Sequence, residues 1–132
     1  MIRLAPAALL ASALLALAGC AAPGSGTPPA SVDGSYRLLS IDGAQIPGSV
    51  FMTIRGSSVR GDGPCNAWWT TNAADWPAMR LAPIAATRRA CLIEGGEAAF
   101  MAALQQAARA EPTPQGLELI GPAHRMVFAM GE

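Results

Sequence analysis

Hydrophobic and polar residues alternate along short stretches after residue 34, which is the pattern of half-buried strands. Residues 35–41 (SYRLLSI) predict a strand that ends at the turn-forming pair Asp42-Gly43. Residues 50–55 predict a second strand with one apolar face, made of Val50, Met52 and Ile54. Residues 56–58 predict a hairpin turn into a third strand. Further extended segments are predicted at residues 65–72, 79–87 (interrupted by Pro83), 116–120 and 124–130.

A single helix is predicted between residues 95 and 112. Apolar residues recur at every fourth position on one face: Phe100, Leu104 and Ala108. Glu97 near the start and Arg109 near the end suit the helix dipole, and Pro112 marks the predicted stop. Many short strands and one helix predict an α+β domain, in which a small, mainly antiparallel sheet or a partly closed barrel packs with one α-helix.

Residues 1–19 are predicted to be a lipoprotein signal peptide. Arg3 supplies a positive charge, and residues 4–17 form an apolar stretch that is shorter than the roughly 20 residues a membrane-spanning helix needs. The ending LAGC (17–20) resembles the bacterial lipobox, which implies cleavage by a lipoprotein signal peptidase and lipidation of Cys20. The alternative is an ordinary secretory signal with a coincidental cysteine. Because Ala21 follows the cysteine, enterobacterial sorting rules favour the outer membrane, with the domain facing the periplasm.

Composition divides the rest of the chain into a linker and one domain. Residues 20–34 are rich in Ala, Gly, Ser, Thr and Pro, which predicts a lipidated N-terminus followed by a flexible linker. Residues 35–131 then form the single domain that a chain of 132 residues has room for. The net charge is near zero and no basic run exceeds Arg88-Arg89, so nucleic acid is not an expected partner.

Two cysteines, Cys65 and Cys91, remain after lipidation of Cys20. In an oxidising compartment an even pair favours a disulfide, here closing a loop of about 26 residues. One alternative is a catalytic dyad of Cys65 with His124, the only histidine. Another is a zinc site formed by Cys65, Cys91 and His124, although their spacing lacks the paired pattern of structural zinc sites. No phosphate-binding, dinucleotide or serine-hydrolase motif occurs, and no catalytic residue, cofactor or metal is predicted.

Aromatic and basic residues supply the candidate binding surface. Trp68 and Trp69 are adjacent in a predicted strand and must point to opposite faces, so at most one lies deep in the core. The other can cover a sheet edge or contact a partner. Arg88 and Arg89 are either a solvated pair or a further contact. We therefore take Trp68, Trp69, Arg88 and Arg89 as a possible surface for an envelope protein or a small ligand.

Three segments together resemble a known family. GDGPCNAWW (61–69), IAATRRAC (84–91) and EAAFMAAL (97–104), followed by a C-terminal hairpin, are similar to the META domain (HslJ-like) family over about residues 35–130. The family's motif positions are occupied by Cys65, Asn66, Thr87, Arg89, Cys91, Glu97, Phe100 and Leu104. The chain departs from the family pattern at Tyr36, where a tryptophan is usual, and at Pro64, where a small residue is usual.

The resemblance implies a small α+β domain of a kind often found in bacterial envelope lipoproteins, some named for heat shock or virulence. It implies no shared catalytic residues. The expected function is that of a membrane-tethered, non-catalytic, stress-related or interaction module of the cell envelope, held on the membrane by the lipid at Cys20. The alternative is a periplasmic enzyme inhibitor comparable to lysozyme inhibitors, or a small hydrolase using Cys65 and His124.

Overall fold

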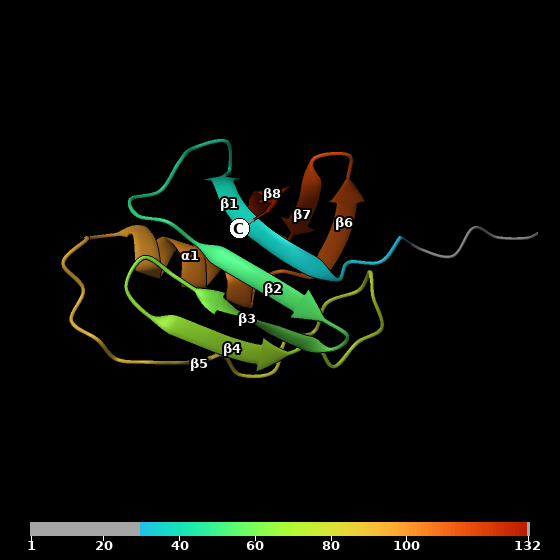
Figure 1. Cartoon of the computed structure of the whole chain (residues 1–132), viewed down its shortest axis with the longest axis horizontal. Coiled ribbons are helices and arrows are strands. Elements are labelled where there is room, and N and C mark those ends of the chain that lie inside the picture. Colours follow the sequence, from blue (N-terminus) through green and yellow to red (C-terminus); the bar gives the residue numbers. More distant parts are fainter. Residues whose placement is uncertain (1–29, 132) are drawn as a thin grey trace, which may run out of the picture.

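The computed structural model describes residues 30–131, which form one eight-stranded sheet and one ten-residue helix (Figure 1). The order of strands across the sheet is β5-β4-β3-β2-β1-β8-β7-β6, and every neighbouring pair is antiparallel. The elements are β1 (Gly34–Ile41), β2 (Phe51–Arg55), β3 (Ser58–Asp62), β4 (Ala67–Thr71), β5 (Ala85–Ala86), α1 (Gly96–Gln105), β6 (Arg109–Thr113), β7 (Gly116–Ile120) and β8 (Arg125–Met130). No helix in residues 30–131 is long and apolar enough to cross a bilayer. The predicted signal peptide and most of the predicted linker lie outside the described residues.

The sheet is open and contains two halves joined by α1. Strands β1 to β5 follow one another in space as they do in the chain, whereas β8 returns to pair with β1 and begins the second half. In the view of Figure 1, α1 lies behind β2. The edge strands β5 and β6 are not paired with each other; the segment between β4 and β5 makes only isolated bridges, at Leu81 with Asn72 and at Ala78 with Arg109. The α+β class is therefore confirmed, but the partly closed barrel is not.

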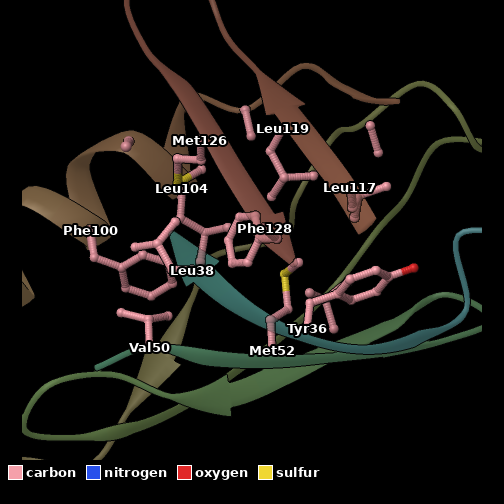
Figure 2. Packing of buried hydrophobic residues seen from close by; sticks show 14 of the residues in the cluster. Tyr36, Leu38, Val50, Met52, Phe100, Leu104, Leu117, Leu119, Met126 and Phe128 are labelled. Carbon is pink, nitrogen blue, oxygen red and sulfur yellow. The ribbon is translucent and has the colours of Figure 1, made fainter. Parts of the chain in front are cut away.

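Alternation along the strands builds the core as the sequence predicts. Val50, Met52 and Ile54 are each at most 1% exposed. Figure 2 shows the helix residues Phe100 and Leu104 pointing into the cluster that the strand side chains form. The other labelled members of that cluster come from β1, β2, β7 and β8 and from the residue just before β2: Tyr36, Leu38, Val50, Met52, Leu117, Leu119, Met126 and Phe128.

The predicted helix over residues 95–112 is too long. α1 ends at Gln105, and Arg109–Thr113 is strand β6, which pairs with β7 along its whole length. Phe100 and Leu104 are buried as predicted, but Ala108 is exposed and its N–H donates to the carbonyl of Ile120. Pairing with β7 thus replaces the last turns of helix, and Pro112 is tolerated because β6 is an edge strand.

The predicted extended segment at residues 79–87 also shortens. Only Ala85–Ala86 pairs as a strand, β5, because the chain before it makes an irregular excursion from β4. Asn72 organises that excursion: its Oδ1 accepts from the N–H groups of Ala74 and Arg80, and its Nδ2 donates to the carbonyl of Ala78. A buried amide with three protein partners stabilises a loop that has no ladder of its own.

Candidate functional site

The two cysteines of the folded domain form a disulfide. Cys65, in the turn between β3 and β4, is bonded to Cys91, in the loop before α1, and their Cα atoms are 5.2 Å apart. The dyad hypothesis is wrong because the Cys65 sulfur is bonded, and because the His124 ring pairs with Asp42. The zinc hypothesis fails for the same reason. Among residues 30–131, no three His, Cys, Asp or Glu side chains are grouped as metal ligands would be.

Asn66 holds the loop that follows β5 against the turn before β4. Its Oδ1 accepts from the Arg89 N–H at 2.7 Å and from the Thr87 hydroxyl at 2.9 Å. The Thr87 Oγ1 in turn accepts from the Ala67 N–H, and the Thr87 N–H donates to the Ala67 carbonyl. The two motif segments therefore meet and bind each other, in what we call the clamp. It consists of Cys65 and Asn66 from one segment and Thr87, Arg89 and Cys91 from the other.

Glu97 secures the other end of the same loop. It lies in the first turn of α1, where a carboxylate suits the helix dipole, and its Oε2 accepts from the Cys65 N–H at 3.0 Å. The helix start packs tightly on the connection between β1 and β2: a Cβ added to Gly96 would lie 1.9 Å from the carbonyl oxygen of Pro47. This position accepts glycine alone, so the entry to α1 is fixed by backbone contact.

The two adjacent tryptophans have different environments. Trp68 is 1% exposed, and its ring centroid lies 5.4 Å from that of Phe100, so it belongs to the core and not to an accessible surface. Trp69 is 50% exposed on the opposite side of β4. The sequence prediction that at most one of the two is deeply buried is confirmed. Of the candidate surface residues, Trp69, Arg88 and Arg89 remain exposed.

We call the side of β1 to β4 that faces away from α1 the outer face. One cross-strand row on it runs Ser35, Thr53, Arg60, Trp69 and Ala85. A hollow of about 520 Å³ lies along this row between Thr53 and Trp69. Arg60 and Trp69 are directly opposite each other, which places their Cβ atoms about 5 Å apart. In the described part of the chain, no ion pair uses Arg60.

Other exposed side chains extend this surface. Phe51 is 38% exposed and Leu39 is 37% exposed, and Arg37 lies directly opposite Phe51. No acidic side chain pairs with Arg37 within residues 30–131. Sequence reasoning missed Arg37, Arg60 and Phe51, although each occupies the polar-face position of its strand. A cross-strand register would have been needed to group them with Trp69.

Arg88 and Arg89 lie away from that row, in the loop of residues 87–95. The same loop carries Leu92, which is 95% exposed, and Ile93, which is 40% exposed. Neither arginine forms an ion pair within the described residues. The predicted surface thus divides into two, the outer face with Trp69 and the loop with Arg88 and Arg89. Sequence reasoning missed Leu92 and Ile93, although an apolar pair beside Cys91 was a signal that could have located them.

The only histidine of the sequence makes a surface side-chain contact that ties two turns together. Asp42 Oδ2 contacts His124 Nδ1 at 2.7 Å, and Asp42 Oδ1 accepts from the Arg125 N–H at 2.9 Å. These bonds, the backbone one first, hold the pKa of Asp42 below its ordinary value of 3.8. They join the turn after β1 to the turn before β8.

We expect the Asp42 carboxylate to stabilise the fold in a pH-dependent manner. Because its pKa is lower in the folded state, its contribution is complete above the unfolded value and is lost as pH falls through the folded one. The denaturant midpoint of the protein should therefore decrease between about pH 5 and about pH 2 more steeply than that of Asp42→Asn. Glu94→Gln, in the exposed loop, is the control, and an Asp42→Asn profile parallel to wild type would contradict the assignment.

Comparison with known proteins agrees with this architecture. A solved structure described as the NMR structure of the protein from Burkholderia xenovorans has a similar fold, with a TM-score of 0.62 and 19% sequence identity, over 83% of this chain and 94% of that one. No match was found among curated proteins. The META domain model matches residues 30–132, which include every described strand and the helix. The chain therefore belongs to the META domain family.

Proposed function

We propose that this protein is a membrane-tethered, non-catalytic interaction module of the cell envelope, which binds another envelope component through its outer face. Membership of the META domain family supports this reading, since no catalytic residue set accompanies the family resemblance. The Cys65–Cys91 disulfide fits an oxidising compartment such as the periplasm. A role in the response to envelope stress belongs to the same proposal, by analogy with family members named for heat shock.

The observation that carries the proposal is the pairing of Trp69 with Arg60 beside a hollow on the outer face. Tryptophan and arginine are the side chains most enriched among residues that dominate binding energy at protein interfaces. Trp69 is half-exposed, and Arg60 has no acidic partner among the described residues. Phe51 adds a second aromatic anchor on the same face. A partner with apolar and polar side chains would fill the hollow of about 520 Å³.

The tether is proposed from the sequence. Cleavage before Cys20 and lipidation of its thiol would attach the domain to the membrane, with Ala21 favouring the outer membrane and a domain that faces the periplasm. Each buried CH₂ of an acyl chain contributes about 0.8 kcal/mol, so two or three chains give a long-lived anchor. The linker that composition predicts over residues 20–34 would hold the domain near the membrane without fixing its orientation.

In-cell photocrosslinking tests the proposal. A photoreactive amino acid is placed at position 69 of the full chain in its host, and at position 130 as a matched control, because Met130 is exposed but lies outside the Trp69 row. We expect a specific crosslinked product from position 69 and none from position 130. Arg60→Gln should reduce the yield several-fold, and Cys20→Ala should remove the protein from the membrane fraction.

Each part of the proposal can fail separately. Crosslinks of equal yield from positions 69 and 130 would show that the outer face is not a selective surface. Membrane association that persists in Cys20→Ala would contradict the lipid anchor, whatever the crosslinks show. Loss of the crosslink in Arg60→Gln supports binding through the outer face only if the variant keeps the denaturant midpoint of the wild type.

A further inference from the structure

Two hollows on the outer face adjoin at Thr53. The hollow of about 520 Å³ beside Trp69 and a second one of about 320 Å³ beside Phe51 are both lined by this residue. Ser35 lines the second hollow and lies opposite Thr53 in the cross-strand row. The two hollows therefore follow the row from Ser35 on β1 to Trp69 on β4, which lie three strand spacings, or about 14 Å, apart. We call this feature the outer groove.

Polar side chains line the middle of the outer groove. The Oγ of Ser35 lies 3.3 Å from the Oγ1 of Thr53, and Ser58 lines the larger hollow. Arg60 and Asp62 line that hollow too, two residues apart on one face of β3, and neither forms an ion pair within residues 30–131. A guanidinium group donates only, a carboxylate accepts only, and a hydroxyl does both. The groove therefore offers a ligand both kinds of hydrogen-bonding partner.

An aromatic ring borders each hollow. Trp69 is 50% exposed beside the larger one, and Phe51 is 38% exposed beside the smaller one. The face of an aromatic ring is negatively polarised, so it attracts the weakly positive C–H groups that line one side of a pyranose sugar. The hydroxyl groups at the rim of such a sugar remain free to bond with polar neighbours. Aromatic rings next to hydroxyl, guanidinium and carboxylate groups thus match the two kinds of surface that a sugar has.

The floor of the outer groove has no main-chain groups to offer a peptide. Strands β1 to β4 are all interior strands of the sheet, in the order β5-β4-β3-β2-β1-β8, so their ladders are occupied on both sides. An extended peptide that binds to a sheet gains much of its affinity from main-chain hydrogen bonds to a free edge strand. A glycan needs no such edge, because side-chain donors, acceptors and rings are sufficient to bind it. The groove therefore favours a glycan over a peptide.

The charges around the groove favour an acidic ligand. None of the arginines of β1 to β4 forms an ion pair among the described residues, whereas those of β6 and β8 each pair with a glutamate. Positive charge that the protein does not compensate attracts anions to that face. The charged residues of β1 to β4 are three arginines and one aspartate, all exposed: Arg37, Arg55, Arg60 and Asp62.

We propose that the outer groove binds the glycan strands of the cell wall, which are chains of pyranose sugars that carry carboxylates. A sugar ring would stack on Trp69, its hydroxyls would bond to Asp62, and a carboxylate would pair with Arg60. The binding is non-covalent. This inference rests on the proposed function, since it names the envelope component that the outer face binds. A domain tethered to the outer membrane and facing the periplasm, as proposed above, would lie beside that polymer.

Cosedimentation with cell-wall sacculi tests the proposal. The mature protein, extracted in detergent, is mixed with insoluble sacculi from which all protein has been removed, and we expect it to sediment with them. Trp69→Ala should weaken binding about tenfold, whereas Trp69→Phe, which keeps an aromatic ring, should retain most of it. Arg60→Gln should weaken binding several-fold, and Met130→Ala, at an exposed apolar position outside the groove, should leave it unchanged.

Competitors identify the bound chemistry. Glycan strands whose stem peptides have been removed with an amidase should compete with the sacculi, and poly-glutamate should not. Competition by poly-glutamate alone would show that the groove takes an acidic peptide and would overturn the proposal. So would the absence of sedimentation of the folded wild type, or binding that is unchanged in Trp69→Ala.

The crosslinking experiment described above keeps this proposal separate from the broader one. The product formed from position 69 should decrease in mass when a muramidase digests the glycan. A protein product that resists muramidase, together with no binding to sacculi, would support an interaction through the outer face and overturn the assignment to a glycan. Equal crosslinking from positions 69 and 130 with no binding to sacculi would overturn both.

Discussion

Replacing Trp68 with alanine is expected to destabilise the domain by about 3–5 kcal/mol. The side chain is 1% exposed, lies opposite Gly61 on β3, and packs its ring against that of Phe100 from α1. Its removal would leave a cavity between the sheet and the helix that neither element can close without moving. Because small domains are stable by only about 5–15 kcal/mol, the loss should be visible as a large decrease in the denaturant midpoint at an unchanged slope.

Trp69→Ala is the matched control, one residue along the same strand. Trp69 is half-exposed on the outer face, so its truncation should cost less than about 1 kcal/mol. The contrast also tests the strand register, because a slip of one residue would exchange the two side chains between core and solvent. Equal losses of stability in the two variants would contradict the described pairing of β4 with β3.

Alternation was sufficient to locate the strands whose two faces differ. At β2, the apolar residues Val50, Met52 and Ile54 at every second position identify both the strand and its inward face, and the structure buries all three. The segment 116–120 was likewise predicted with the bounds that β7 has. In such strands the local pattern and the tertiary environment agree, so one sequence contains the necessary information.

The end of α1 could not be predicted in this way. The alanine-rich segment after Leu104 favours helix by local propensity, and Pro112 provided the first clear stop. In the structure, pairing of Arg109–Thr113 with β7 and complete burial of Ala110 favour a strand instead. The pairing partner is the next segment of the chain, beyond residues 114–115, and periodicity within a single segment cannot reveal it.

The candidate sites, too, were predictable only where local sequence patterns were sufficient. Counting cysteines predicted the disulfide, and alternation predicted that Trp68 and Trp69 face opposite ways. Which of them is buried depends on Phe100, which is 32 residues from Trp68 in the chain. The grouping of Trp69 with Arg60 depends on the register between β3 and β4. The prominence of Leu92 depends on the clamp formed by Asn66, which is visible only in three dimensions.

Removal of the Cys65–Cys91 disulfide is expected to destabilise the domain by about 3.5 kcal/mol in the chain-entropy model. The bond closes a loop of 26 residues that contains β4, β5 and the irregular segment between them. Without it, the unfolded chain gains freedom, whereas Asn66, Thr87 and the β4–β5 pairing still hold the folded loop. The double variant Cys65→Ser/Cys91→Ser should therefore fold and unfold at a much lower denaturant concentration.

Reductant provides the control for this prediction. It should decrease the midpoint of the wild type to near that of the double variant and have no effect on the double variant itself. Hydrogen exchange should separate the global effect from a local one, since the amide of Arg89 is held by Asn66 independently of the disulfide. If the double variant kept the wild-type midpoint, the loop would have to be restrained in the unfolded state by other contacts, and the chain-entropy account would be wrong for this domain.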